Sequence, residues 1–156
     1  SSHLMAYAGF SPRFKYKGGQ MGINEKIGFF PGVFDLLHMG HILAFKEAKK
    51  YCDKLVVWIQ VDPSIERPEK KKPILSLEER VEILSAIKYI DAIGSYETEA
   101  ELNEMDEVHP YDIRFVGEDH KGKLFKPIKG KIHYLSRKHN YSSSGLRKRI
   151  LEMEKK

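Results

Sequence analysis

The sequence has little of what marks a secreted or a membrane protein. Its 156 residues include a single cysteine, Cys52, so an intramolecular disulfide is excluded. No apolar run approaches the roughly 20 residues that a membrane-spanning helix needs, and this excludes an integral membrane protein. The chain does not open with the charged and then apolar segments of a secretory signal. We therefore expect a cytoplasmic location.

The sequence also lacks internal repeats and low-complexity tracts, and its composition is that of a globular domain. Apolar residues make up 41% of the chain and charged residues 31%, which is too apolar for intrinsic disorder. The length leaves room for one ordinary domain. Residues 1–5 resemble the remnant of an expression tag, and glycines with little apolar periodicity follow. We therefore predict an N-terminal extension over residues 1–25 and one domain over residues 26–156.

Positive charge is in moderate excess. Lysine and arginine number 27 against 22 aspartates and glutamates, which gives a formal net charge of +5. Such an excess suits anionic partners, and nucleic acid, nucleotides and phosphorylated metabolites all remain open. The positive residues cluster at residues 70–72, 137–138 and 147–149. Solvated surface lysine explains about half of such clusters.

Apolar strands alternate with amphipathic helices along the chain. This alternation predicts right-handed crossovers and a mostly parallel sheet, as in a Rossmann-like three-layer α/β sandwich. The expected strands cover residues 27–30, 54–61, 92–94, 113–116 and 131–135. The expected helices begin near His41, after the cap residue Ser76, at Glu99 and near Ser143.

Ligands in an open parallel sheet gather outside the carboxyl ends of the strands. The loops that follow these ends cover residues 31–41, 62–76, 117–123 and 136–144. The charged second loop has only Ile65, Ile74 and Leu75 to attach it to a core, so we expect it to be mobile without ligand and ordered when triphosphate and acceptor are bound. Other notable residues have structural interpretations: Trp58 as core, Cys52 as an inert buried thiol, and residues 147–149 as a solvated helix face. Leu146, Ile150 and Met153 mark one face of the last helix.

The first loop carries two histidines, His38 and His41, with Gly40 between them. They follow a strand and a glycine turn, and they open a helix whose free N–H groups and positive dipole end suit an anion. Two imidazoles at this point can donate to phosphate oxygens. A zinc site is the weaker alternative, because the Glu of His-Glu-x-x-His and a paired thiolate are both missing. Histidines that only satisfy core polar groups are a further alternative.

Residues 32–41, Gly-Val-Phe-Asp-Leu-Leu-His-Met-Gly-His, resemble the signature of the His-x-Gly-His nucleotidyltransferase superfamily, in particular its cytidylyltransferase branch. Later segments are similar to further motifs in the same order. They are Lys-Lys-Pro with Ser-Leu-Glu-Glu-Arg at residues 71–80, Val-Gly-Glu-Asp-His-Lys-Gly-Lys at residues 116–123, and residues 137–144. The last two resemble glycerol-3-phosphate cytidylyltransferase.

The resemblance implies a role for each matching residue. The catalytic residues it implies are His38, His41, Lys72 and Arg137. The nucleotide-binding residues it implies are Gly32, Val33, Phe34, Gly40, Lys71, Gly117, Asp119, Tyr141, Ser142, Ser143 and Ser144. The acceptor-binding residues it implies are Asp35, Asp62 and Arg80, and no metal is held by the protein itself.

The resemblance further implies a reaction. A phosphate oxygen of a small phosphorylated acceptor, similar to glycerol-3-phosphate, would attack the α-phosphorus of CTP, and pyrophosphate would leave. Mg²⁺ would accompany the CTP and bridge triphosphate oxygens. A homodimer is expected, without nucleic acid as a partner. The alternatives are an adenylyltransferase of the same superfamily that uses ATP, a basic nucleic-acid-binding module, and a regulatory domain that only binds nucleotide.

Overall fold

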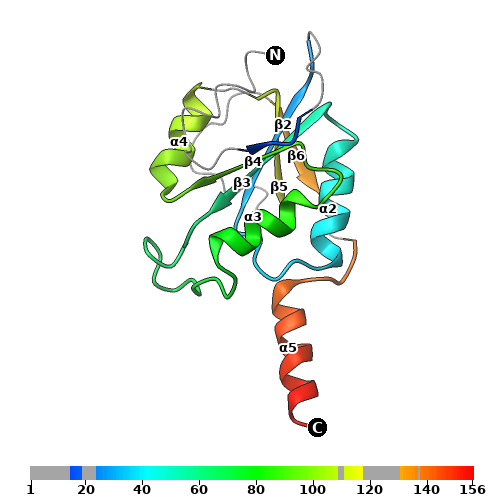
Figure 1. Cartoon of the computed structure of the whole chain (residues 1–156), viewed down its shortest axis with the longest axis vertical. Helices are drawn as coiled ribbons and strands as arrows, with labels where there is room; N and C mark the ends of the chain where they lie inside the picture. Colours follow the sequence, from blue (N-terminus) through cyan, green and yellow to red (C-terminus); the bar gives the residue numbers. More distant parts are fainter. Residues whose placement is uncertain (1–14, 19–23, 109–110, 118–130, 137) are drawn as a thin grey trace.

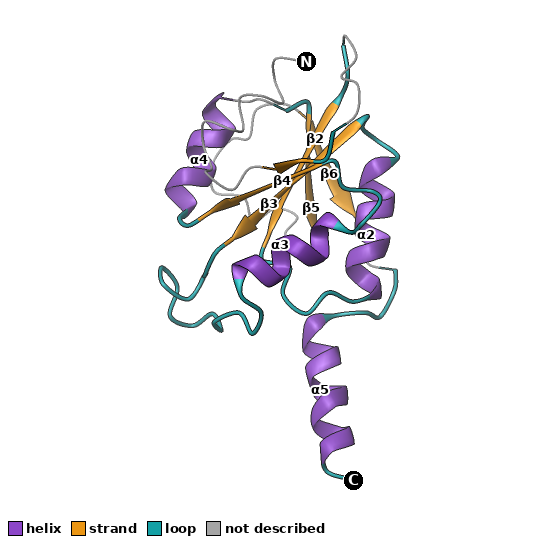
Figure 2. Ribbon diagram, viewed as in Figure 1, coloured by secondary structure: helices purple, strands orange, loops and turns teal. Residues whose placement is uncertain are grey.

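The computed structural model describes residues 15–18, 24–108, 111–117, 131–136 and 138–156 (Figures 1 and 2). A six-stranded sheet with the order β1-β4-β3-β2-β5-β6 forms its centre. The edge pair β1–β4 is antiparallel, and the other pairs are parallel. The strands are β1 (Lys15–Tyr16), β2 (Ile27–Gly32), β3 (Lys54–Gln60), β4 (Ala92–Tyr96), β5 (Ile113–Gly117) and β6 (Lys131–Leu135). The predicted α/β class with a mostly parallel sheet is confirmed.

Helices cover both faces of this sheet. On one face, Phe45 of α2 (Met39–Lys49) and Leu84 of α3 (Leu77–Ser85) pack in one cluster with Val57 of β3. On the other face, Met105 of α4 (Glu99–Val108) packs in a second cluster with Trp58 of the same strand. Neighbouring residues of β3 thus enter different clusters, as the alternation of side chains along a strand requires. The described residues therefore form three layers.

The central strands are apolar because both of their faces are covered. Every residue of β3 after Lys54 is buried. Trp58 is 1% exposed and lies against Gly94 of β4, where a Cβ atom would come within 2.1 Å of the indole ring. Gly94 is therefore the residue that lets this ring lie on the neighbouring strand, and the prediction of Trp58 as core is confirmed.

The boundaries differ from the sequence expectation in a few places. β2 continues through Pro31 to Gly32, where we expected a turn, and α2 begins at Met39, two residues early. β1 was not expected, because a strand of two residues has no alternation to detect, and it lies in the range assigned to the N-terminal extension. The last helix, α5 (Ser143–Glu154), begins where predicted, but none of its residues is buried.

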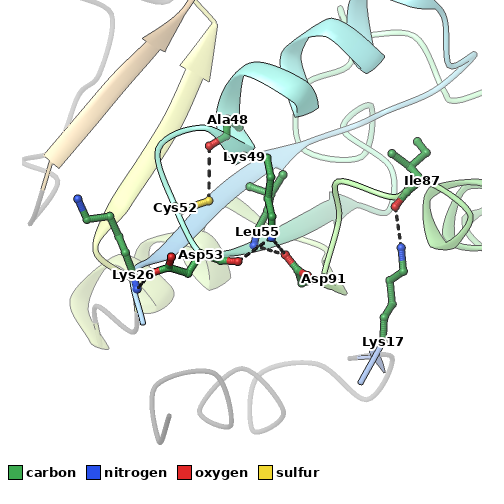
Figure 3. Close-up of polar contacts among 9 residues, drawn as sticks. All are labelled: Lys17, Lys26, Ala48, Lys49, Cys52, Asp53, Leu55, Ile87 and Asp91. Atoms are coloured by element: carbon green, nitrogen blue, oxygen red, sulfur yellow. Dashed lines mark hydrogen bonds and ion pairs between the residues drawn. The ribbon is translucent and has the colours of Figure 1, made fainter. Parts of the chain in front are cut away.

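The amino edge of the sheet is closed by aspartates, two of which are drawn in Figure 3. Asp53, Asp91 and Asp112 each stand directly before a strand and accept a hydrogen bond from a backbone N–H group of the neighbouring strand segment. The donors are Lys26 at 2.7 Å, Leu55 at 2.8 Å and Ile27 at 2.8 Å, respectively. Lys49 of α2 also donates to the Asp91 carboxylate. Backbone groups at the strand starts are thus satisfied without a ligand.

The carboxyl edge is arranged differently, because β2 and β5 separate there. Their pairing ends at Phe29 and Arg114. Beyond that point β2 stays with β3 as far as Gly32, whereas β5 stays with β6 as far as Gly117. The order in which strands are added to the sheet also reverses at this point. β3 and β4 lie on one side of β2, whereas β5 and β6 lie on its other side. Such a switch point is where open α/β sheets bind ligands.

Candidate functional site

The two predicted histidines lie at this switch point, in the first turn of α2. His38 is the N-cap residue, and its Nδ1 atom accepts a hydrogen bond from the backbone N–H of Gly40 at 3.0 Å. Nδ1 of His41 accepts from the backbone N–H of His38 at 3.2 Å. The imidazoles therefore replace the usual Ser and Glu of a reciprocal capping box. Because both Nδ1 atoms accept, we assign the ring proton of each neutral imidazole to Nε2.

The neutral form of His41 is the stable one. Burial, the neighbouring His38 and, with opposite sign, Asp35 together lower the pKa of His41 to about 4. The two ring centroids are 4.1 Å apart, so two charged imidazoles would repel each other. At neutral pH this helix start therefore presents an uncharged N–H donor from His41.

The loop before these histidines holds a strained backbone. Phe34 and Leu36 have backbone φ angles of 54° and 45°, which residues other than glycine rarely adopt. The ring of Phe34 is 6% exposed and packs against Phe30 and Phe45 at centroid distances of 5.2 and 5.4 Å. This aromatic packing holds the loop in place. We predicted Phe34 as a nucleotide-binding residue, but only its backbone remains available for such a contact.

Gly40 permits a close approach at the same helix start. A Cβ atom here would lie 2.7 Å from Cε1 of His38 and 3.1 Å from Cε1 of His139. His139 belongs to the segment between β6 and α5, so this segment reaches the first turn of α2. A side chain at position 40 would push the two parts of the site apart.

Asp35, predicted to bind the acceptor, joins parts of the protein instead. Its carboxylate is 7% exposed and accepts from the backbone N–H groups of Ile74 and Leu75 at 2.8 and 2.9 Å. Arg147 of α5 donates to the same carboxylate at 3.1 Å. These contacts give Asp35 a structural role, and its contact with an acceptor stays a prediction. Arg147, expected to be solvated, is held by this ion pair.

Arg80, the second predicted acceptor ligand, is 2% exposed. Its guanidinium group donates to the carbonyl oxygens of Val33, Gln60 and Val61 at 2.7 to 3.0 Å, and to that of Ser76 at 3.3 Å. These carbonyls belong to the loop after β2, to the end of β3 with the residue after it, and to the N-cap of α3. Arg80 therefore holds these segments together, and its contact with an acceptor stays a prediction.

The loop over residues 62–76 carries the predicted lysines at the surface. Lys71 and Lys72 are exposed, and so are Ile65 and Ile74, which are 76% and 61% exposed. The isoleucines therefore do not hold the loop to the core, and the mobility expected of the loop stays a prediction. At its end, the backbone N–H groups of Ile74 and Leu75 donate to the Asp35 carboxylate. A sequence cannot indicate this contact, since 39 residues separate Asp35 from Ile74.

Lys72 borders an open cleft of about 780 Å³ between this loop, the start of α3 and the end of β4. Asp62, the third predicted acceptor ligand, also lines it, and its carboxylate accepts from the backbone and the hydroxyl of Ser64. The hydrogen bonds from Ser64 lower the pKa of Asp62, so this group is an anion at neutral pH. The cleft thus carries both signs of charge where the loop meets the sheet.

The start of α5 carries the predicted phosphate-binding hydroxyls. Ser142 is the N-cap residue and accepts from the backbone N–H of Gly145 at 2.9 Å. Ser143 and Ser144 occupy the first turn, and Tyr141 before them is 45% exposed. Gly117, also predicted to contact nucleotide, ends β5. Arg137 and Asp119 lie outside the described residues.

Glu47 of α2 was not among the predicted residues. One carboxylate oxygen contacts Nε2 of His133 at 2.7 Å, and the other accepts from the backbone N–H of Ser136 at 3.1 Å. Its position on a helix, far from these partners in sequence, gave no signal. Among the described residues, no group of three or more histidines, cysteines or acidic residues could hold a metal ion. In that same part of the chain, no helix has the length and apolar character needed to cross a membrane.

A switch-point site with two histidines at a helix start and a second helix start nearby defines the class of α/β nucleotidyltransferases. The chain belongs to the cytidylyltransferase-like family, whose model matches residues 29–149. The family predicted from residues 32–41 and the later motifs is therefore confirmed.

The chain is also similar to two curated proteins. The chain is 28% identical over 141 residues to the bifunctional protein HldE of Granulibacter bethesdensis. This match covers 86% of this chain and 28% of HldE. The chain is 45% identical over 62 residues to the FAD synthase of Thermococcus sibiricus, covering 40% of this chain and 42% of the synthase. The chain thus spans less than half the length of either relative.

A solved structure is similar along most of the chain. It is the lipopolysaccharide core biosynthesis protein from Thermoplasma volcanium, with a TM-score of 0.52 and 28% sequence identity. The match covers 84% of this chain and 90% of that one.

Proposed function

We propose that this chain transfers a nucleotidyl group from a nucleoside triphosphate to a small phosphorylated acceptor. A phosphate oxygen of the acceptor forms a bond to the α-phosphorus, the bond from that phosphorus to the bridging oxygen breaks, and pyrophosphate leaves with the electron pair. The arrangement of His38 and His41 at the start of α2 is the observation that carries this proposal. The acceptor phosphate is already an anionic nucleophile, so no strong general base is required. The protein has to position the two substrates and stabilise the charge that develops during transfer.

The neutral state of His41 supports its assignment as a hydrogen-bond donor to the phosphates. With Nδ1 held by a backbone N–H group, the proton on Nε2 is fixed in one tautomer. Burial of a neutral donor costs little free energy. Its hydrogen bond becomes strongest when negative charge develops on a phosphoryl oxygen. The N–H groups at the start of α5 would donate to the β- and γ-phosphates and bind the triphosphate.

Lys72 is proposed to neutralise charge on the α-phosphate and the acceptor, with Lys71 as its alternative. Its position on the border of the cleft supports this role. The cleft volume of about 780 Å³ is in the range of small-molecule sites and would admit the acceptor. Asp35 and Arg80 would hold the walls of this cleft.

The charge of the triphosphate calls for a divalent cation, and Mg²⁺ is the ion we propose. The described residues fit a cation held mainly by triphosphate oxygens and water, since they contain no group of three or more histidines, cysteines or acidic residues that could hold a metal ion. Bound there, Mg²⁺ would supply charge neutralisation of the triphosphate. The protein's own contribution would be the alignment of its N–H donors and lysines.

Two donor nucleotides are candidates. CTP is the prediction from residues 116–123 and 137–144, which resemble the cytidylyl branch. ATP is the second candidate, because the similarity to an enzyme named FAD synthase is 45% over 62 residues, and FAD contains an adenylyl group. The proposed homodimer has no bearing on this choice.

The experiment is a panel of the four nucleoside triphosphates, each with Mg²⁺ and a set of phosphorylated acceptors, in which pyrophosphate release is measured. We expect turnover with CTP or ATP only, and thermal stabilisation by the same nucleotide, since a ligand that binds the native state raises its stability. Lys46→Ala, an exposed change on α2, serves as the control variant. Salt-dependent binding of RNA or DNA without turnover would instead favour the nucleic-acid-binding alternative.

A further inference from the structure

Polar contacts join the segment that runs from the end of β6 into the first turn of α5 to the rest of the described residues. We define this segment as residues 136–147, of which residue 137 lies outside the described residues. In Figure 1, α5 points away from the sheet and its covering helices, and none of its residues is buried. Apolar packing therefore does not fix the direction in which this segment leaves β6. Polar contacts with the loop after β2 and with α2 therefore help to fix its position relative to His38 and His41.

Two acidic residues supply such contacts, and they bracket the histidines in sequence. Asp35 holds the far end of the segment through Arg147 at 3.1 Å. Glu47 holds the near end through the backbone N–H of Ser136 at 3.1 Å. Between these ends, His139 approaches Gly40. The unit formed by the loop after β2 and by α2 thus carries the histidines and also both anchors of the segment.

The Glu47 anchor is itself fixed by packing. Its side chain is 25% exposed, and that of His133, which contacts it at 2.7 Å, is 19% exposed. The His133 ring packs at a tilt against Tyr51, which lies two residues after the end of α2, with centroids 4.1 Å apart, and it meets the edge of Phe115 at 5.6 Å. The carboxylate therefore has one orientation, and a charge-assisted hydrogen bond to a backbone N–H group is stronger than a neutral one.

We propose that Glu47 is a positioning residue that sets the distance between the α2 histidines and the start of α5, so that both reach one triphosphate. This inference rests on the proposed function for its kinetic consequence, but its structural consequence does not. The segment would contact the triphosphate equally in the ground state and the transition state. Loss of the anchor would then weaken nucleotide binding uniformly, which raises KM and leaves kcat nearly unchanged.

The test compares Glu47→Ala, Glu47→Gln and Lys49→Met. Glu47→Ala removes the anchor, and Glu47→Gln restores an acceptor oxygen for Ser136. Lys49→Met is the matched control, because Lys49 lies two residues further along α2 and makes an ion pair of similar exposure with Asp91 at the amino edge (Figure 3). It removes a charged contact of the same helix without touching the segment.

Two measurements are made on each variant: KM and kcat for the nucleotide that the wild type uses, and backbone hydrogen exchange of residues 136–147 without nucleotide. We expect Glu47→Ala to raise KM about 5- to 10-fold with kcat within about 2-fold, in line with the loss of one charge-assisted hydrogen bond. Exchange in the segment should accelerate. Glu47→Gln should recover most of both effects, and Lys49→Met should show neither.

Equal KM values and equal exchange in Glu47→Ala and Lys49→Met would overturn the proposal. If Glu47→Ala does not fold, Glu47→Asp, which is one methylene shorter, takes its place and should raise KM at an unchanged melting temperature. If the wild type turns over no nucleotide, the proposed function fails, and hydrogen exchange still decides whether Glu47 positions the segment.

Discussion

The amino and carboxyl edges of the sheet use aspartates for different purposes. At the amino edge, Asp53, Asp91 and Asp112 satisfy backbone N–H groups of neighbouring strand segments. At the carboxyl edge, Asp35 accepts from a loop and from an arginine of the last helix. The backbone there includes two residues with positive φ, and the helix start is capped by imidazoles. Aspartates thus stabilise the strands at the amino edge, whereas at the carboxyl edge an aspartate holds a loop and the last helix beside the candidate site.

The largest effect is expected at the carboxyl edge, where His38→Ala and His41→Ala should each lower the rate of nucleotidyl transfer about 100- to 1000-fold. Loss of one preorganised donor commonly has this size. The free energy of unfolding should fall by no more than about 1 kcal/mol, the value of one hydrogen bond. Initial rates and urea unfolding would be measured together, with Lys46→Ala as the control. A folded variant with a near-normal rate would remove the histidines from the mechanism.

The amino edge should respond in the opposite manner. Asp91→Ala leaves the backbone N–H of Leu55, in a fully buried residue, without its acceptor, whereas the ammonium of Lys49 keeps the carbonyl oxygen of Asp53. We expect the free energy of unfolding to fall by about 2 to 3 kcal/mol, and kcat to stay unchanged. Urea unfolding followed by circular dichroism measures the first quantity, with exposed Glu82→Ala as the control. A loss of activity without a loss of stability would contradict the division between the edges.

Acidification should weaken the protein through the carboxyl edge. The pKa of His41 is about 4 in the folded protein and 6.5 ordinarily, so the unfolded chain binds the proton more tightly. The contribution of neutral His41 is complete above pH 6.5 and is lost as the pH falls toward 4. Between pH 7 and pH 5 this amounts to about 2 kcal/mol. Urea midpoints of the wild type and His41→Ala at both pH values give the difference, and parallel pH profiles would show that His41 does not titrate this way.

The smallest effect is expected from Lys72→Ala. This side chain is exposed, so solvent screens its charge until substrates enter the cleft. We expect kcat to fall about 10-fold, by more than KM rises, because the ammonium would act mainly on charge that develops during transfer. Lys71→Ala is the matched variant. Normal rates in both variants would mean that the lysines form only a solvated surface.

Local sequence patterns predicted most of the strands and helices of the fold. The apolar run at residues 54–61 became the buried strand β3, and Ser76 with Glu79 became a reciprocal capping box at the start of α3. These signals work because strand burial and helix capping depend on residues a few positions apart. The two-residue strand β1 has no such pattern, and α5 shows that an amphipathic stripe alone does not bury a helix.

The site was predicted less completely, and the reason is distance along the chain. His38 and His41 are capped by their own neighbours, so their place at a helix start was accessible to sequence reasoning. Asp35 and Arg80 resemble ligand-binding residues, but their partners lie 39 to 112 and 4 to 47 residues away, respectively. A motif places a residue near a site, and only the packed structure shows whether its hydrogen-bonding groups face a ligand or the protein.

The position of Trp58 has a practical consequence for spectroscopy. It is the single tryptophan of the chain, it is 1% exposed, and it lies on the face covered by α4, whereas the histidines lie on a helix of the other face. Its fluorescence in the native protein should therefore have the short-wavelength emission of a buried indole, with a shift to longer wavelengths on unfolding. Nucleotide binding at the carboxyl edge should leave this emission almost unchanged. One intrinsic fluorophore thus reports global unfolding separately from occupancy of the site.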